Sequence, residues 1–429
     1  MITAVSKLKL RFGDWLRNSA LVWKLHAFCL AIRSLGQHKI EVRLLTLSYA
    51  YRRWPTAWLQ SRLSPWLTPD RGAIWREKNI GWERYQQRLN DHGLIKSILL
   101  KAPHPWGEKG VLYVAFEYNW LRLLKHHDIR KLMQDYLIVG ASSCSPPDFS
   151  AHWALAHVGP DPVFMQISNS SDMLLYGRFN HNIRPIPIMA SDWINPAFYQ
   201  PKPHSQRGID LLVVAGWGRV KRHWTLFNAL KKMRKGLRVV LIGQDMDGRT
   251  AADVLNEARV FGVANRIEMI CDARIEDVAR HQCDSKASVI LSAREGACVV
   301  VSESLFADAP VALFHDAHIG SSRYINEETG IFLHRETMAA QLESLIDESD
   351  KFSPRRWAEV NINCSQTSGR LNQLLRDYSA SVCIPWTCDI TPICWHPDPE
   401  YMSPVDRSAM TSSYSDLMER HNLSISPYT

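Results

Sequence analysis

The chain has 429 residues, of which 46% are hydrophobic and 22% are charged, and its formal net charge is +8. This is the composition of a folded protein, and it excludes a disordered or collagen-like chain. The length predicts two or three domains, whose cores are large enough to fold without disulfide or metal support.

The positive charge is confined to the N-terminal segment. Residues 1–66 hold eleven basic and two acidic residues, a net charge of +9, whereas the remaining 363 residues sum to −1. A general nucleic-acid-binding protein is expected to carry a basic field over its binding domain, so the sequence argues against a nucleic-acid partner.

Residues 1–90 are predicted to form a basic helical extension, because apolar residues recur there at steps of three and four. These residues are Leu21, Leu25, Phe28, Cys29 and Ile32, followed by Val42, Leu45 and Tyr49. Two interpretations stay open. Residues 1–66 either form a cap on the next domain, with a solvated Lys/Arg face, or contact an anionic membrane or an acidic partner.

The apolar stretch 20–32 contains Lys24 and His26. It is too short and too polar to span a bilayer, and no small-residue cleavage site follows it, which argues against a signal peptide. We therefore expect a cytoplasmic protein, either free or peripheral at the inner face of the membrane.

Nine cysteines are scattered without a C-x-x-C pair, which favours free thiols in a reducing compartment. One group near the C-terminus invites comparison with zinc sites: Cys383, Cys388, Cys394 and His396. Its spacings do not match those of structural zinc sites, so we expect no metal.

From residue 91 to 200 the pattern changes to short apolar runs between helical stretches. The runs are residues 95–100, 111–116, 136–139, 163–167 and 183–188. This alternation predicts a first α/β domain with a parallel sheet. The proline-rich stretch 185–203 is predicted to be a linker.

Residues 201–375 are predicted to form a second α/β domain. Five strands are expected at residues 209–214, 237–242, 266–270, 287–292 and 310–314, with helices at 224–233, 251–261, 275–282 and 298–307. Regular alternation of this kind indicates a doubly wound sheet, in which ligands bind at the carboxyl ends of the strands.

The loop after the fourth of these strands carries Glu295 and Glu303, eight residues apart. If a helix begins near Gly296, its free N–H groups favour a diphosphate. Glu303 lies among apolar residues, where an unpaired carboxylate is costly and a hydroxyl-rich ligand would satisfy it. The alternative is a solvated helix flank.

The loop after the first strand offers two glycines and three cations. Gly216 and Gly218 allow a close approach of the backbone, and Arg219, Lys221 and Arg222 are donors suited to phosphate oxygens. An ordinary basic loop is the alternative here.

Residues 209–333 resemble the donor-binding domain of GT-B glycosyltransferases of retaining family 4, also called group 1. The matching stretches are 214–216 with Arg219 and Lys221, 241–243, 262–267, 292–303 with its two glutamates, 307–311 and 328–332. They keep the order and the approximate spacing of the family over about 125 residues.

The resemblance implies an α/β fold with two Rossmann-like domains, in which 91–200 is the acceptor side and 201–375 binds the donor. The tail, 376–429, would carry a helix that crosses back to the first domain. The implied reaction transfers a sugar, with retention, from a nucleoside diphosphate sugar to a glycan or lipid-linked acceptor in polysaccharide biosynthesis. No metal and no cofactor are expected.

By position in the resemblance, Glu295 is the catalytic residue and would bond a donor-sugar hydroxyl, while Glu303 would bond the ribose. The residues that would hold the diphosphate are Gly216, Arg219, Lys221, Gly296, Ala297 and Cys298.

The sequence departs from the family in two places. Trp217 stands where the family has arginine, and the first domain lacks a glycine-rich opening loop. In that domain His157, Asp172 and Asp192 are either structural or line the cleft. The alternatives are a non-catalytic GT-B-like protein that binds sugar nucleotides and a basic adaptor that uses residues 1–66.

Overall fold

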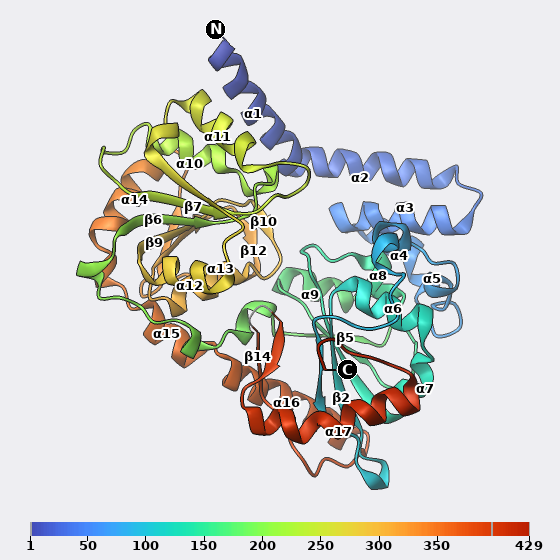
Figure 1. The fold of residues 1–429 in the computed structure, drawn as a ribbon. Coiled ribbons are helices and arrows are strands. Elements are labelled where there is room, and N and C mark those ends of the chain that lie inside the picture. The colour runs from blue at the N-terminus through green and yellow to red at the C-terminus, as the bar shows by residue number, and fades with distance from the viewer. Residues whose placement is uncertain (1, 396–397, 429) are drawn as a thin grey trace. The chain divides into compact units, whose positions relative to one another are not determined.

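The computed structural model describes residues 2–395 and 398–428. It divides into two compact units (Figure 1). Unit 1 comprises Met1–Ser19 and Ile194–Asn363, and unit 2 comprises Ala20–Trp193 and Cys364–Thr429. The expected extension 1–90 is therefore not one body, because its first helix belongs to unit 1 and the remainder to unit 2. The chain passes between the units at 19/20, 193/194 and 363/364, whereas the sequence suggested domain boundaries at 90/91, 200/201 and 375/376.

Unit 1 is built on a six-stranded sheet in which all neighbouring strands are parallel. The strands are β6 (Ile209–Val214), β7 (Val239–Gly243), β8 (Ile267–Cys271), β9 (Ser285–Ile290), β11 (Val311–Phe314) and β13 (Gly330–Leu333). Their order is β13-β11-β9-β6-β7-β8, the Rossmann order, with its switch point between β6 and β9. The prediction of a doubly wound sheet is confirmed, and β13 adds a sixth strand to the five expected.

Of the helices in unit 1, the first four below lie between strands of this sheet, and the last two follow β13. They are α10 (His223–Leu230), α11 (Ala251–Phe261), α12 (Ile275–Cys283), α13 (Val299–Phe306), α14 (Met338–Asp347) and α15 (Pro354–Asn361). α11 shows why the sequence was informative. Thr250 and Asp253 form a capping box at its start, and Gly262 ends it with a φ of 72°, a conformation that glycine adopts without strain.

The N-terminal helix α1 (Ile2–Asn18) packs on unit 1 through a buried ion pair. Asp14 is 7% exposed and Arg222 is 2% exposed, and the Nε atom of Arg222 lies 3.1 Å from Oδ1 of Asp14. Desolvation lowers the pKa of Arg222, and Asp14 opposes that shift. Arg222 was a candidate phosphate ligand, but its guanidinium is engaged by Asp14 and lies over the ring of Phe314.

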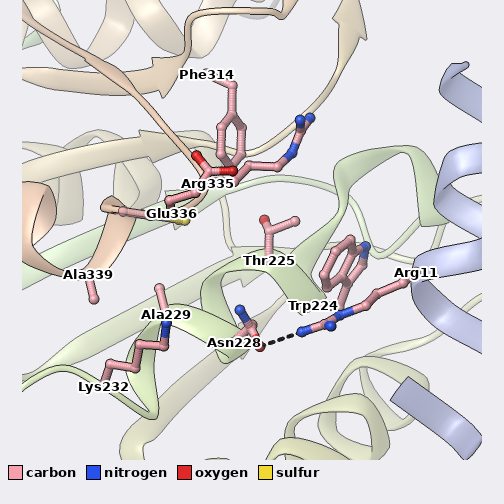
Figure 2. A pocket seen from close by; sticks show the side chains of 11 residues that line it. Arg11, Trp224, Thr225, Asn228, Ala229, Lys232, Phe314, Arg335, Glu336 and Ala339 are labelled. Carbon is pink, nitrogen blue, oxygen red and sulfur yellow. Dashed lines mark hydrogen bonds between the residues drawn. The ribbon is translucent and has the colours of Figure 1, made fainter. Parts of the chain in front are cut away.

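A second contact of α1 borders a pocket of about 420 Å³ (Figure 2). There Arg11 donates a hydrogen bond of 3.2 Å to the side-chain oxygen of Asn228 on α10. Lys7, further toward the N-terminus, lies over the ring of Phe261. Charged groups of α1 thus contact unit 1 beside Leu10, which packs against the apolar core of that unit.

Unit 2 contains a five-stranded sheet in the order β1-β2-β3-β4-β5. The strands are β1 (Ser97–Lys101), β2 (Gly110–Ala115), β3 (Tyr136–Ala141), β4 (Val163–Gln166) and β5 (Ile183–Ile186). β2 to β5 are parallel as expected, but β1 is antiparallel to β2. Residues 102–109 are too few for the crossover that a parallel pair needs, so the chain turns back as a hairpin.

The remaining elements of unit 2 are mostly helical. They are α2 (Ala20–Leu35), α3 (Ile40–Arg53), α4 (Ala57–Leu63), α5 (Ile74–Glu77), α6 (Glu117–His126), α7 (Ile129–Asp135), α8 (Phe149–Trp153), α9 (Ser170–Tyr176), α16 (Cys364–Ser381), the hairpin β14 (Ile393–Trp395) and β15 (Pro399–Tyr401), and α17 (Pro404–His421). No helix among the described residues is long and apolar enough to cross a membrane.

The C-terminal segment completes the core of unit 2. Trp395 packs edge-on against Tyr113 of β2, and the hydroxyl of Tyr401 donates to the backbone oxygen of Leu99 at 2.6 Å. Tyr414 on α17 accepts from the N–H of Leu99. These two hydroxyls satisfy backbone groups of the edge strand β1, which would otherwise lack partners.

The ion pair between α1 and unit 1 makes a direct prediction. Asp14→Ala leaves the Arg222 charge buried without its carboxylate, so we expect a loss of about 3 kcal/mol in the free energy of unfolding. Urea denaturation followed by tryptophan fluorescence measures it. Asp245→Ala, at an exposed site, is the matched control and should change stability by less than about 0.5 kcal/mol. Equal effects of the two substitutions would contradict an anchoring role.

Candidate functional site

The switch point of the unit 1 sheet brings together the two loops that the sequence singled out. β6 and β9 are hydrogen-bonded neighbours. From β6 the chain continues to β7 and β8 at one edge of the sheet, and from β9 it continues to β11 and β13 at the other edge. A crevice is expected outside their carboxyl ends. The loop after β6 carries Arg219 and Lys221, and the loop after β9 carries Glu295.

Lys221 and Glu295 are in direct contact. The Nζ atom of Lys221 donates to Oε1 of Glu295, and the Ser292 hydroxyl donates to the same oxygen at 2.7 Å. Both charged side chains are 19% exposed, so the pair is accessible from solvent. Residues 74 positions apart in the sequence thus form one polar centre.

Glu295 lies on a short strand and is separated from the following helix by a loop. It belongs to β10 (Arg294–Glu295), which pairs in parallel with β12 (His318–Ile319). α13 starts at Val299, three residues later than the expected start near Gly296, because Cys298 adopts a left-handed conformation with a φ of 49°. Glu295 and Glu303 therefore lie on different elements, β10 and α13.

The residues that follow Glu295 lie in the loop that leads into α13. Gly296, Ala297 and Cys298 are each partly exposed. The backbone oxygen of Gly296 accepts from Gly320 at 2.8 Å, which ties the loop to the following part of unit 1. Burial raises the pKa of the Cys298 thiol to about 12, so this cysteine is a neutral thiol and no nucleophile.

Glu303 lies on α13 and is partly buried. Gln282 donates to its Oε2 atom at 3.1 Å. Burial raises the pKa of Glu303, and the Gln282 donor offsets part of that rise. The carboxyl group thus has remaining acceptor capacity in a position where water is scarce, as expected for a group that receives ligand hydroxyls.

Trp217 is a core residue. It is fully buried, and a Cβ atom on Gly243 would come within 2.9 Å of its ring. The residue at the family's arginine position therefore cannot reach a phosphate, whereas the exposed Arg219 can. Gly216 is also closely approached, since a Cβ atom there would lie 3.0 Å from the sulfur of Met246.

The structure adds cations that the sequence did not single out. Burial lowers the pKa of Arg17 on α1, Asp14 opposes this shift, and the nearby charges of Arg219 and Arg249 lower the pKa further. His223 is 1% exposed, and burial, with help from Arg249 and Lys221, lowers its pKa to about 3, so it is neutral. Only the packing of α1 on unit 1 reveals that Arg17 belongs to this basic group.

Unit 2 has a buried polar network at the carboxyl ends of β2 and β3, which the sequence analysis missed. Glu117 is 1% exposed and accepts from the backbone N–H of Ser143 at 3.1 Å and from the Ser142 hydroxyl at 3.2 Å. His152 lies 3.6 Å away and bonds the Tyr176 hydroxyl through its other nitrogen. Desolvation opposes ionisation, but His152 and Ser143 outweigh it and lower the pKa of Glu117 to about 2.

The three polar residues nominated in the first α/β domain all have structural hydrogen bonds. His157 lies 3.1 Å from the backbone oxygens of Leu67 and Asn180. Asp172 accepts from Ser145, and Asp192 accepts from the N–H of Met189 at 3.0 Å. They support the structural interpretation.

Within residues 2–395 and 398–428, no group of three or more His, Cys, Asp or Glu side chains is arranged to hold a metal ion. His396, one member of the C-terminal set considered for zinc, lies outside the described residues.

No protein-family model matches the chain, and no curated protein sequence matches it. Among solved structures it is similar to sucrose-phosphate synthase from Thermosynechococcus elongatus, with 14% identity, a TM-score of 0.49, and coverage of 63% of this chain and 74% of that one. It is also similar to a UDP complex of TarM from S. aureus, with 13% identity, a TM-score of 0.46, and coverage of 56% of this chain and 50% of that one. For Anabaena HepE with UDP the identity is 12%, the TM-score 0.48, and the coverage 58% of this chain and 75% of that one. The match therefore spans half the length of TarM. The fold itself, two Rossmann-like α/β units, is evident from the sheets of this chain.

The Glu117 network makes a prediction for unit 2. Glu117→Gln removes the charge that Ser143 and His152 stabilise, so we expect a loss of about 1–3 kcal/mol in unfolding free energy at pH 7. Because the folded-state pKa lies below the unfolded one, wild-type stability from this group is complete above about pH 4.5 and is lost as pH falls toward 2. Urea denaturation of both proteins over that range measures it, with the exposed Glu83→Gln as the control. A variant that keeps the wild-type stability at every pH would show that the network contributes nothing.

Proposed function

We propose that the chain is a GT-B glycosyltransferase that moves a sugar from a nucleoside diphosphate sugar to a glycan or lipid-linked acceptor, with retention and without a metal ion. The observation that carries this proposal is the contact of Lys221 with Glu295 at the switch point of a Rossmann sheet. A cation for a diphosphate and a carboxylate for a sugar are adjacent where such a sheet binds its ligand.

The pair has a simple role in donor binding. A diphosphate competes with Glu295 for Lys221, so an arriving donor exchanges one ionic partner of the lysine for another. Glu295 keeps its bond from Ser292 and gains a free acceptor site for a donor-sugar hydroxyl. Holding that hydroxyl orients the anomeric carbon for transfer.

The diphosphate is held by cations and backbone N–H groups. Arg219 and Lys221 come from the loop after β6, and the amides of Gly296, Ala297 and Cys298 come from the loop that leads into α13. Negative charge grows on the departing phosphate as the bond to the anomeric carbon breaks. Donors already in place stabilise that charge where it develops, which lowers the barrier.

Glu303 is proposed to bind the ribose of the donor. Its ionised carboxyl group accepts hydrogen bonds from two hydroxyls, and Gln282 fixes its orientation. The acceptor is bound elsewhere, and we assign its site to unit 2, because the resemblance makes residues 91–200 the acceptor side.

The first test combines donor binding with transfer. A thermal-shift panel of UDP, GDP and ADP, each with its sugars, should identify one stabilising nucleotide, and nucleotide release with acceptor should follow for that donor. Glu295→Ala should lower the transfer rate by about a hundredfold, since one transition-state contact of this kind contributes on the order of 3 kcal/mol. The exposed Glu327→Ala is the control in the same unit.

Two results would count against the proposal. Wild-type transfer rates in Glu295→Ala would remove the assigned role of that residue. Donor binding without nucleotide release over a broad set of acceptors would favour the non-catalytic sugar-nucleotide-binding protein.

The raised pKa of Glu303 predicts a pH dependence of nucleotide affinity. Protonation removes an acceptor from the ribose hydroxyls, so affinity should fall as pH decreases, beginning at a higher pH than for an ordinary glutamate. Glu303→Gln should bind the nucleotide about tenfold more weakly. Its affinity should also lack the part of the pH dependence that comes from protonation of Glu303. Calorimetric titration of both proteins from pH 8 to pH 5 measures it, and the nucleotide's own titration is common to the two curves. Parallel curves would exclude Glu303 from the ribose site.

A further inference from the structure

The N-terminal helix α1 is oriented with its apolar face away from the protein. The residues that contact unit 1 include Lys7, Leu10, Arg11 and Asp14, of which three are charged. A helix that caps a domain normally buries its apolar face and leaves the charged one in water. In α1 the buried ion pair of Asp14 with Arg222 fixes the opposite orientation.

The outward face of α1 is correspondingly apolar. Its large side chains are Val5, Leu8, Phe12 and Trp15, which are 48%, 67%, 56% and 49% exposed. Their spacing of three and four residues places them on one side of the helix. The rings of Phe12 and Trp15 stack on each other, with centroids 5.9 Å apart.

Helix α2, in unit 2, also presents large apolar side chains to water, although the residues on its inward face are small or apolar. Ala27 and Ser34 are buried, and Leu30 and Ala31 are partly buried against the core. The outward residues are Leu21, Leu25, Phe28, Ile32 and Leu35, each between 54% and 60% exposed. They follow steps of four and three residues, so they form a second continuous apolar stripe.

The solvated face of α1 and α2 is therefore more apolar than a cap with a Lys/Arg face would be, because large apolar side chains lie beside the exposed basic residues. Ten large apolar side chains face water on these two helices within the described residues: the four on α1 and five on α2 named above, and Leu16 of α1, which is 41% exposed. We call them the N-terminal stripe. An apolar row of this length on each helix marks an interaction site, because exposing it is costly.

The charge around the stripe decides what covers it. Residues 1–35 contain six basic residues and one acidic residue, Asp14, and that carboxylate is already paired with Arg222. Lys9, Lys24 and Arg33 are exposed beside the stripe. A second copy of the chain would bring the same positive charge to the contact, whereas an anionic lipid surface is complementary to it.

We propose that the N-terminal stripe docks α1 and α2 in the interface of an anionic bilayer. Each helix lies in the plane of the membrane, with its leucine and aromatic side chains at the boundary of headgroups and acyl chains and its lysines and arginines on lipid phosphates. The proposal does not depend on the reaction of the protein, since it concerns neither loop of the donor site.

Vesicle sedimentation of the full chain tests it. We expect the protein to sediment with vesicles of phosphatidylcholine and phosphatidylglycerol, but at least tenfold less with pure phosphatidylcholine. Leu8→Glu combined with Leu25→Glu should lower binding to the anionic vesicles at least tenfold. The matched control is Val360→Glu with Leu174→Glu, one exposed apolar residue from each unit outside the stripe, and it should bind as the wild type does.

The charge is tested separately. Lys24→Gln combined with Arg33→Gln should weaken binding severalfold and reduce its dependence on salt. All six positions are exposed, so circular dichroism should show unchanged folding. No sedimentation of the wild type, equal losses in the stripe and control variants, or a dimer in solution that only the stripe variant dissociates would each overturn the proposal.

Discussion

The order of the parallel strands in unit 1 is the constraint on which the candidate site depends. β6 and β9 are neighbours in the sheet although the chain inserts β7 and β8 between them in sequence. The connections from these two strands run in opposite directions, so their loops leave a space at the carboxyl edge. Lys221 and Glu295 face each other because of this order, and their chemistry follows from that proximity.

A second constraint is the burial of Arg222. A guanidinium that is 2% exposed needs a carboxylate, and the partner comes from residue 14, near the start of the chain. One ion pair therefore binds the N-terminal helix to unit 1 by its charged side. The same contact turns the apolar side of the helix outward, which links the packing of unit 1 to the surface that we propose for membrane docking.

Unit 2 achieves its stability differently. Its strands are in sequential order, every residue of β1, β2 and β3 is buried, and the edge strand β1 depends on the C-terminal segment for hydrogen-bond partners. Glu117 accepts hydrogen bonds from Ser142 and Ser143 and lies 3.6 Å from His152, which ties the loop after β3 to α6.

The local pattern of residues determined most of the fold. Short apolar runs located the strands of both units to within a few residues. At α11, Thr250 and Asp253 cap the start and Gly262 ends the helix, and these signals are local because each acts within one helical turn. Glu295, Glu303, Arg219 and Lys221 were also recognisable as candidates from loop position and resemblance.

Only the tertiary structure decided which groups meet: Arg222 with Asp14, Lys221 with Glu295, Glu117 with His152. It also decided which face of α1 is outward. Helical periodicity identifies two faces of a helix, but the partner that a buried charge finds across 208 residues determines which face the protein covers.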